Sequence, residues 1–155
     1  MPQEYSIRKA SHKDLHTIVS FTLQEAREAE AAEKDAGVVR RGVLAGLDDP
    51  AVASYWVAES NDGEVVASTS VVREWSNWHA GYYWWVQSLY IVPGHRGRGL
   101  VELLLDVLHR EAQAAGALDL RLYAHTSNRR AIEAYRRCGF STAPYTIMTR
   151  RLHSD

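Results

Sequence analysis

The feature that most constrains this chain is the glycine-rich turn Gly94-His95-Arg96-Gly97-Arg98-Gly99, because it separates a strand-like segment from a helix-like one. The preceding segment, 82–92, is rich in aromatic and β-branched residues and ends at Pro93. After the turn, apolar residues recur at helical spacing, at Leu100, Leu103, Leu104, Val107 and Leu108. The first N–H groups of a helix have no partner within it, and the helix dipole is positive there. The turn therefore predicts a site for an anion.

Two common phosphate-binding motifs do not fit this turn. The P-loop pattern Gly-x-x-x-x-Gly-Lys-Ser/Thr is absent, and Gly97-Arg98-Gly99 does not extend to Gly-x-Gly-x-x-Gly because position 102 is Glu. Gly97 and Gly99 would let the backbone approach a phosphate closely, and Arg96 and Arg98 would supply charge. Taken alone, the turn is either an anion site or a glycine-rich loop with solvated arginines.

Composition sets the class of protein. With 155 residues, of which 46% are hydrophobic and 24% charged, we expect a single globular domain covering residues 1–155. The net charge of -1 argues against binding to nucleic acid or to an anionic membrane. One cysteine, Cys138, permits neither an intramolecular disulfide nor a cysteine-based zinc cluster, and we expect no metal. Since no apolar run could span a bilayer and the N-terminus lacks a signal-peptide pattern, we expect a cytoplasmic protein.

Periodicity and turn residues predict elements in the order β-α-α-β-β-β-α-β-α-β. Strands are expected at 5–9, 55–58, 65–72, 82–92, 118–123 and 145–152. Helices are expected from Asp14 to a break at Gly37, from Val39 to Leu47, from Leu100 to before Gly116, and from Asn128 to Arg137. This order predicts an α/β (α+β) fold, in which a mixed sheet carries helices on both faces.

Two motifs resemble the GCN5-related N-acetyltransferase (GNAT) superfamily. Arg96-Gly97-Arg98-Gly99-Leu100-Val101 is similar to its Arg/Gln-x-x-Gly-x-Gly/Ala, which follows a strand and opens a helix, although Val101 replaces a small residue. The segment from Asn128 to Phe140 matches the family's Asn-x-x-Ala-x-x-x-Tyr-x-x-x-Gly-Phe. The two motifs stand in the family's order, and the resemblance covers the chain from about Val65 onward.

The resemblance implies a mostly antiparallel sheet that splays apart at its fourth and fifth strands, with acetyl-CoA bound between them as co-substrate. The backbone of Leu89 and Ile91 would hold the pantetheine arm and polarise the thioester carbonyl. The pyrophosphate would lie on the turn from Arg96 to Val101. The residues implied to bind the cofactor are Leu89, Tyr90, Ile91, Arg96, Gly97, Arg98, Gly99, Leu100, Val101, Asn128, Ala131 and Tyr135.

The resemblance also implies a general acid. Tyr135 lies seven residues after Asn128, on the same helix face, and would protonate the departing thiolate. The alternative for Tyr135 is a buried aromatic that only packs.

The general base is less constrained. An amine must lose a proton before it attacks, and the carboxylates expected nearby are Glu28 and Glu30, followed by Glu74. Each of them could equally be a solvated charge. Gln87 stands where related diamine acetyltransferases carry Glu, and it can at most orient a water or the substrate.

An aromatic stretch beside Glu74 provides information about which kind of acceptor the protein binds. It contains Trp75, Trp78, Tyr82, Tyr83, Trp84 and Trp85, and alternation would send Tyr83 and Trp85 to one sheet face and Tyr82 and Trp84 to the other. Aromatic rings beside carboxylates suit a cationic amine, although core packing alone explains many of them. The same strand is also a reasonable contact for a homodimer.

We therefore expect an acetyl-CoA-dependent N-acetyltransferase that acts directly on a primary amine of a small, cationic acceptor, polyamine-like or aminoglycoside-like. Two alternatives stay open. One is acetylation of a protein N-terminus or lysine, which predicts an open peptide groove. The other is a non-catalytic acyl-CoA sensor, which Gln87 keeps under consideration because it cannot act as a base.

Overall fold

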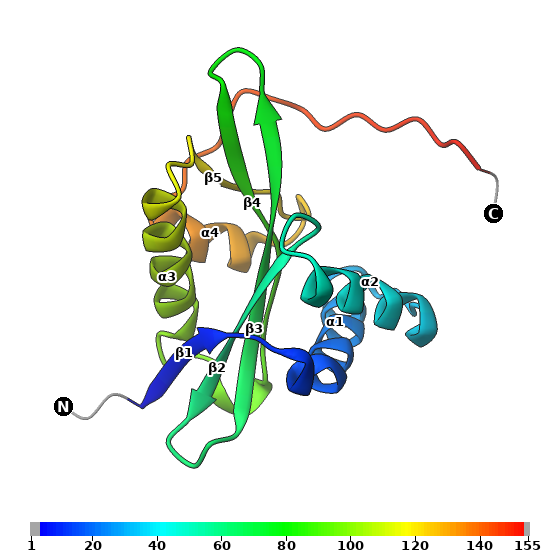
Figure 1. Cartoon of the computed structure of the whole chain (residues 1–155), viewed down its shortest axis with the longest axis vertical. Helices are drawn as coiled ribbons and strands as arrows, with labels where there is room; N and C mark the ends of the chain where they lie inside the picture. Colours follow the sequence, from blue (N-terminus) through cyan, green and yellow to red (C-terminus); the bar gives the residue numbers. More distant parts are fainter. Residues whose placement is uncertain (1–3, 154–155) are drawn as a thin grey trace.

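The computed structural model describes residues 4–153 and contains a five-stranded sheet with helices on both faces (Figure 1). The strands follow one another across the sheet in the order of the chain, and all neighbours are antiparallel except the last pair, which is parallel. The predicted mixed sheet is confirmed. The strands are β1 (Tyr5–Lys9), β2 (Ser54–Ser60), β3 (Val65–Ser76), β4 (Gly81–Ile91) and β5 (Leu120–Leu122).

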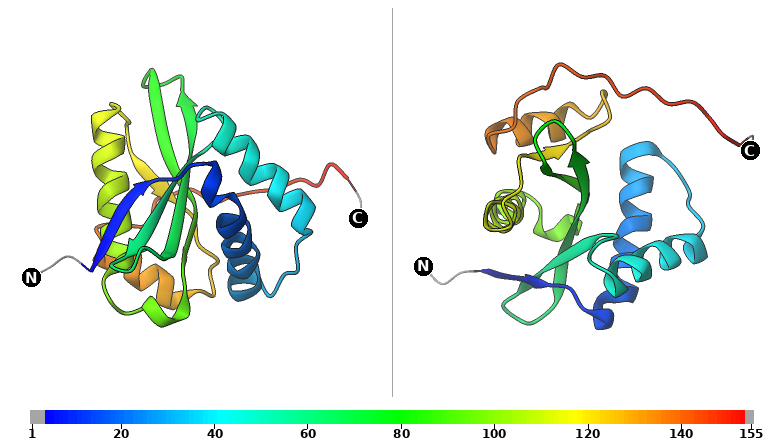
Figure 2. Two further views of the ribbon diagram at one scale, coloured as in Figure 1. Left: turned by 60° about the horizontal axis from the view of Figure 1, so that its bottom comes forward. Right: turned by 45° about the horizontal axis from the view of Figure 1, so that its top comes forward.

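The helices form two layers, one on each face of the sheet (Figure 2). One layer holds α1 (Leu15–Glu30) and α2 (Ala36–Asp48), and the other holds α3 (Leu100–Ala114) and α4 (Arg129–Arg137). Single turns of 3₁₀ helix, η1 (His12–Asp14) and η2 (Pro93–His95), precede α1 and follow β4. Within residues 4–153, no helix is both long and apolar enough to cross a membrane.

Each layer packs on the sheet through the apolar stripe that the sequence shows. On the α3 face, Leu105 and Leu108 are buried against Trp84 and Trp56. On the other face, Ile18 and its neighbours from α2 and β2 form a separate cluster. Because both faces of the sheet are covered, its central strands are held rigidly, and they can position a site at the sheet edge.

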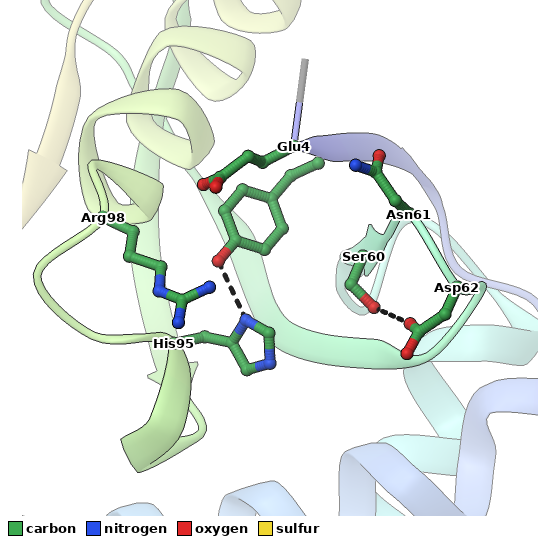
Figure 3. Close-up of a pocket in the computed structure, with 7 residues that line it drawn as sticks. Glu4, Ser60, Asn61, Asp62, His95 and Arg98 are labelled. Atoms are coloured by element: carbon green, nitrogen blue, oxygen red, sulfur yellow. Dashed lines mark hydrogen bonds between the residues drawn. The ribbon is translucent and has the colours of Figure 1, made fainter. Parts of the chain in front are cut away.

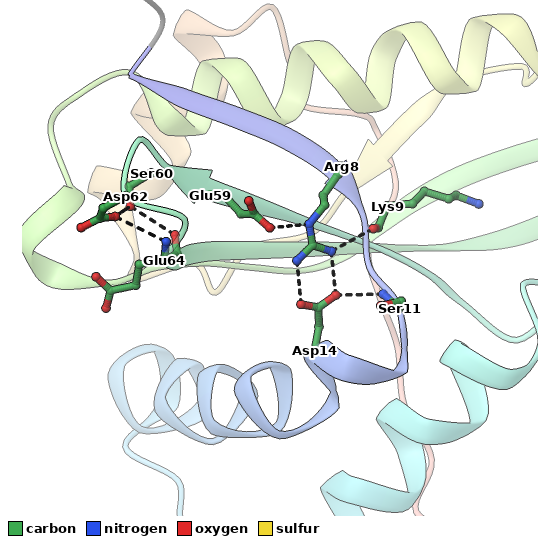
Figure 4. Close-up of polar contacts among 8 residues, drawn as sticks. All are labelled: Arg8, Lys9, Ser11, Asp14, Glu59, Ser60, Asp62 and Glu64. Carbon is green, nitrogen blue, oxygen red and sulfur yellow. Dashed lines mark hydrogen bonds and ion pairs between the residues drawn. The ribbon is translucent and has the colours of Figure 1, made fainter.

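A partly buried ion pair fixes the start of α1 against β1 (Figure 4). Both amino groups of the Arg8 guanidinium donate to the Asp14 carboxylate, at 2.8 and 2.9 Å, and its Nε donates to Glu59 at 2.6 Å. The Asp14 carboxylate also accepts the Ser11 N–H at 2.8 Å, which caps the first turn. Arg8 holds the pKa of the Asp14 carboxyl below its ordinary value. The ionised pair therefore sets where α1 begins.

The expected helix break at Gly37 is wrong. Helix α1 ends at Glu30, and Ala31 takes a left-handed conformation with φ of 52°. Asp35 then begins α2, because its side chain accepts the Val38 N–H at 2.9 Å, and Gly37 lies inside the first turn. An Asp that caps a helix outweighs the modest cost of a glycine within it.

The expected strand at 145–152 is also wrong. The segment after α4 is extended but pairs with no strand of the described residues, and it runs away from the body of the molecule (Figure 1). Its apolar side chains are exposed. Alternation in sequence predicts a strand only where a neighbouring strand can take up the backbone hydrogen bonds, and a lone strand is not stable in water.

A bulge in β4 produces the expected splay. Val71 is opposite Val86 and Ser70 is opposite Ser88, so Gln87 is one extra residue in β4. β5 pairs with β4 only up to Val86. Beyond the bulge, β4 continues alone toward the glycine turn, and its outer edge is open to side chains and ligands.

Candidate active site

The open edge of β4 holds backbone groups that side chains satisfy in place of a strand. The Leu89 N–H donates to the Glu25 carboxylate at 2.8 Å. Two residues further on, the Ile91 carbonyl accepts from the Arg96 Nε at 2.9 Å. Residues two apart in a strand present their backbone to the same edge, so both groups face the gap that the bulge opens. These are the two residues whose backbone the family resemblance places on the acyl donor.

Glu25 is a carboxylate on the buried face of α1. It follows Ile18 by seven residues and Phe21 by four, and both of these are buried. Burial raises the pKa of Glu25 to about 7, although the hydrogen bond from Leu89 favours the charged form. A carboxyl group with a pKa near 7 is half ionised at neutral pH, and can therefore both take up and release a proton.

Tyr135 lies on α4, on the opposite side of the sheet from α1 (Figure 2). Its half-buried ring packs edge-on against Phe140, with centroids 6.1 Å apart. Burial raises the pKa of the Tyr135 hydroxyl, and the charge of Glu25 raises it further. The structure thus brings a carboxyl from α1 and a phenol from α4 within electrostatic range of each other.

The start of α4 explains how Tyr135 is placed. The Asn128 side chain accepts the Ala131 N–H at 3.3 Å and so caps the helix. Tyr135 follows the cap by seven residues, about two turns on the same face. The predicted role of Asn128 and Ala131 in binding the cofactor stays a prediction, and the structure adds a positioning role for Asn128.

The glycine turn has the backbone conformation that the anion prediction requires. Gly97 and Gly99 have φ of 76° and 80°, in the left-handed region that favours glycine. Gly99 is the N-cap of α3 and supplies no side chain to the free N–H groups of the first turn. Leu100 is buried and Val101 is half-buried, so the helix start is fixed by packing. The bound anion itself stays a prediction.

Arg96 is occupied by a carboxylate in this structure. Its Nη2 lies 3.0 and 2.9 Å from the two carboxylate oxygens of Glu28, and its guanidinium lies 5.5 Å from the centre of the Tyr90 ring. Glu28 here takes the position toward Arg96 that a phosphate oxygen could take, because Arg binds both groups through the same planar N–H fork.

A hydrogen bond ties the turn to β1. The Tyr5 hydroxyl and the His95 Nδ1 are 2.8 Å apart, and the two rings meet nearly edge to face (Figure 3). Arg98 lies beside this pair at the rim of a hollow (Figure 3). The hollow is lined by Glu4, Tyr5, Ser60, Asn61, Asp62, His95 and Arg98. The turn is therefore held at both ends, by β1 and by the packed start of α3.

The carboxylates expected to act as the base are not the ones that the structure places at the β4 edge. Glu28 is bound to Arg96, and Glu30 is the exposed last residue of α1. Glu74 accepts the Trp85 indole N–H at 3.0 Å. Gln87 is exposed at the bulge.

Sequence reasoning missed Glu25, although a signal was present. A carboxylate at a position that continues the buried stripe of a helix is unusual unless it is paired or functional.

The aromatic stretch divides between the two faces, as alternation predicted. Trp84 is buried beside Trp56, with ring centroids 6.4 Å apart. Tyr83 and Trp85 lie on the other face, the one on which α1 packs, and the Arg121 guanidinium lies 3.5 Å from the centre of the Tyr83 ring. Glu74, Tyr83 and Trp85 therefore form a polar and aromatic surface on the same sheet face as Glu25.

Among the described residues, no group of three or more His, Cys, Asp or Glu side chains could hold a metal ion. Cys138 is a free cysteine that packs in the cluster containing Leu108 of α3 and Tyr135 of α4. It therefore helps to hold α4 against α3.

Comparison with known proteins places this geometry in one family. Residues 13–140 match the acetyltransferase (GNAT) family. A mycothiol acetyltransferase from Nocardia farcinica is 32% identical over 123 residues, which are 79% of this chain and 37% of that protein. The chain thus spans little more than a third of the length of that relative.

Two further relatives match over nearly their whole length. An aminoalkylphosphonate N-acetyltransferase from Salmonella typhimurium is 29% identical over 139 residues, covering 90% of this chain and 86% of the relative. The crystal structure of a possible acetyltransferase from Clostridium difficile superposes with a TM-score of 0.90 at 28% identity, covering 98% of this chain and all of the other.

Proposed function

This chain belongs to the acetyltransferase (GNAT) family, and we propose that it transfers an acetyl group from acetyl-CoA to a primary amine of a small acceptor. The observation that carries the proposal is the open edge of β4, where the Leu89 N–H donates to the Glu25 carboxyl, whose pKa is about 7 and whose charge also raises the pKa of Tyr135. A backbone donor, a base and an acid are the groups that acyl transfer to an amine requires.

The donor groups at this edge fit acetyl-CoA. The Leu89 N–H can donate to a thioester carbonyl oxygen, while Arg96, Arg98 and the free N–H groups at the start of α3 suit a pyrophosphate. Acetyl-CoA supplies an activated acetyl group in a thioester. In this structure, the carboxylates of Glu25 and Glu28 hold two of these donors, the Leu89 N–H and the Arg96 guanidinium. Both carboxylates must therefore release their partners when the co-substrate binds.

We infer that Glu25 is the general base. When the Leu89 N–H passes to the thioester oxygen, the Glu25 carboxylate loses its partner and becomes available to the incoming amine. The acceptor ammonium first loses one proton to solvent, and the neutral amine then attacks; Glu25 takes the second proton from the nitrogen as the new N–C bond forms. The C–S bond then breaks, and Tyr135 supplies a proton to the departing sulfur. Replacing Glu25 by Gln should lower kcat by about 10²–10⁴-fold, which is the usual contribution of a general base.

The other carboxylates are weaker candidates for the base. Glu28 is paired with Arg96, and its side chain is 45% exposed, so it lies outside the buried part of the site where Glu25 meets the Leu89 N–H. Glu74 is engaged by Trp85 and is better suited to the acceptor than to the reacting nitrogen. Gln87, at the bulge, could orient an acceptor or a water but cannot take a proton.

The surface around Glu74, Tyr83 and Trp85 is our candidate for the acceptor site. A carboxylate beside aromatic rings favours a cationic acceptor, polyamine-like or aminoglycoside-like. Arg121 introduces a positive charge on the same surface, stacked on Tyr83. That charge favours an acceptor that carries both an amine and an anionic group, the chemistry named for the relative that acts on aminoalkylphosphonates.

A panel of acceptors tests the proposal. Initial rates of CoA release from acetyl-CoA should be measured with spermidine, an aminoglycoside, 2-aminoethylphosphonate and a lysine-containing peptide, and each product should be confirmed by mass spectrometry. We expect turnover with at least one small amine to exceed turnover with the peptide. Faster turnover of the peptide would favour protein acetylation, and binding of acetyl-CoA without turnover of any amine would favour the sensor alternative. Either result would overturn the proposal.

A further inference from the structure

The glycine turn, residues 94–99, is held by little packing at its glycines. Apart from chain neighbours, a methyl group added at Gly94 or Gly97 would meet no atom of residues 4–153 within 4 Å, and one added at Gly99 would meet only the Glu102 carboxylate, at 4.0 Å. A glycine-rich segment loses much conformational entropy when it is ordered. The order of this turn in the free chain therefore depends on a small number of hydrogen bonds.

Tyr5 is the buried residue that links this turn to the sheet. Its hydroxyl lies 2.8 Å from the His95 Nδ1, and the two rings meet at 72° with their centroids 5.7 Å apart (Figure 3). Tyr5 is only 3% exposed, so its end of the hydrogen bond is shielded from water. The His95 N–H also donates to the Val92 carbonyl, at 3.0 Å. His95 is thus held by its main chain to the end of β4 and by its ring to β1.

Two parts of the fold hold Tyr5 itself in place. Its backbone is paired with that of Ser60, the last residue of β2. Its ring belongs to the core cluster that contains Ile91, the last residue of β4, and Leu100, the first residue of α3. The glycine turn runs between Ile91 and Leu100. Tyr5 therefore packs with the segments on both sides of the turn and bonds to the turn between them.

The conformation that this link maintains is the one that an anion requires. Gly97 and Gly99 have left-handed backbones, and Gly99 leaves the first N–H groups of α3 without a side-chain cap. If the turn has this conformation for only a fraction of the time, the apparent Kd for an anion rises as the inverse of that fraction. A link that orders the turn in advance therefore strengthens binding without touching the ligand.

We infer that Tyr5 is a positioning residue for acetyl-CoA, because through His95 it holds residues 94–99 in the conformation that binds the pyrophosphate. The inference rests on the proposed function, which assigns acetyl-CoA to this turn. Glu25 and Tyr135 lie outside the turn, so Tyr5 should affect the binding of the donor and not the chemical step. A Tyr5 that only stabilised β1 would instead affect stability and leave donor binding unchanged.

The affinity for CoA, which carries the pyrophosphate and cannot react, tests the inference directly. Tyr5→Phe removes the hydroxyl and keeps the ring, and His95→Phe removes the ring nitrogens. In isothermal titration calorimetry, each change should raise the Kd for CoA by about 3–10-fold, the usual contribution of one hydrogen bond. The KM for acetyl-CoA should rise by the same factor while kcat is unchanged. The double variant should bind no more weakly than the weaker of the two single variants, because both changes break the same contact.

Tyr82→Phe is the matched control, since it removes a phenol hydroxyl at the other end of β4 and should leave the Kd unchanged. An unchanged Kd in Tyr5→Phe, or effects of the two changes that multiply in the double variant, would overturn the inference and leave the proposed function intact. A native chain that binds no CoA would overturn both.

Amide hydrogen exchange separates positioning of the turn from general stabilisation of the sheet. In the free chain, Tyr5→Phe should speed exchange in peptides that cover residues 94–99, and saturating CoA should restore the native rates. Exchange in β2, which pairs with β1, should stay at the native rate, and the urea midpoint should change little. A native rate of exchange in the turn of Tyr5→Phe would contradict the inference, whatever the rates in β1 and β2.

Discussion

Replacing Glu25 by Gln should stabilise the folded chain at alkaline pH while it lowers activity. Glu25 is a carboxyl on the buried face of α1, and among residues 4–153 it accepts a hydrogen bond from the Leu89 N–H alone. A glutamine side chain at this position has nearly the same shape, can still accept that N–H through its amide oxygen, and carries no charge. The variant therefore removes the cost of burying a carboxylate and keeps most of the packing.

The magnitude follows from the pKa. Burial raises the pKa of Glu25 from its ordinary 4.5 to about 7. Since each pKa unit corresponds to about 1.4 kcal/mol, ionising Glu25 in the folded chain costs up to about 3 kcal/mol of stability. The sign follows from linkage: a raised carboxyl pKa contributes stability that is complete below pH 4.5 and is lost as the pH rises through 7. At pH 8 we expect Glu25→Gln to raise the free energy of unfolding by about 1–3 kcal/mol. The increase can be smaller than the full cost of ionising Glu25, because the Leu89 N–H forms a weaker hydrogen bond with an amide oxygen than with a carboxylate.

Urea denaturation followed by tryptophan fluorescence measures this effect at pH 5 and pH 8. The variant should be more stable than the native chain at pH 8 and close to it at pH 5, where Glu25 is protonated in the folded state. Glu30→Gln is the matched control, since Glu30 is exposed at the end of the same helix and should change stability by less than about 0.5 kcal/mol at either pH. Equal effects of Glu25→Gln at both pH values would refute the reasoning.

Three further predictions concern other parts of the structure. Tyr135→Phe should lower kcat by about 10–10⁴-fold with little change in stability, because the ring contact with Phe140 is kept; an unchanged kcat in steady-state assays would remove Tyr135 from the role of acid. Arg96→Ala should raise the KM for acetyl-CoA by about tenfold, the loss of one charge-assisted contact, yet change the urea midpoint little, because its ion pair with Glu28 is exposed. Asp14→Asn should cost about 1–3 kcal/mol at pH 7, and since the hydrogen bond from Arg8 lowers the pKa of Asp14 in the folded state, urea titrations should show this cost shrinking as the pH falls below the ordinary carboxyl pKa of 3.8 and through the lowered one.

Much of the fold could be predicted because the signals are local. The glycine turn, the apolar stripe of α3 and the Asn128 cap each determine one element boundary through hydrogen bonds or packing within a few residues. The helix break at Gly37 was misplaced because Asp35 acts as a cap, which depends on one side-chain conformation. The strand at 145–152 was wrong because its formation requires a neighbour that the chain does not provide in the structure.

The cofactor-binding part of the site could be predicted from the sequence, whereas the general base could not. The Gly97 and Gly99 conformations follow directly from the motif, since few other residues adopt a positive φ. Glu25 and Leu89 are 64 residues apart, and their contact depends on the bulge at Gln87 turning the β4 edge toward α1. The sequence does contain a signal for Glu25, because this carboxylate lies at helical spacing from Ile18 and Phe21, on the buried face of α1.

The pH dependence of kcat/KM tests the role of Glu25 in amine acetylation most directly. It should be measured for the best amine acceptor with the native chain and with Glu25→Gln, and the ratio of the two values should be taken at each pH, so that ionisation of the amine cancels. We expect a ratio that is large and constant above about pH 7 and falls about tenfold per pH unit below it, as Glu25 becomes protonated. A ratio near one, or one that does not change between pH 5 and pH 8, would contradict it.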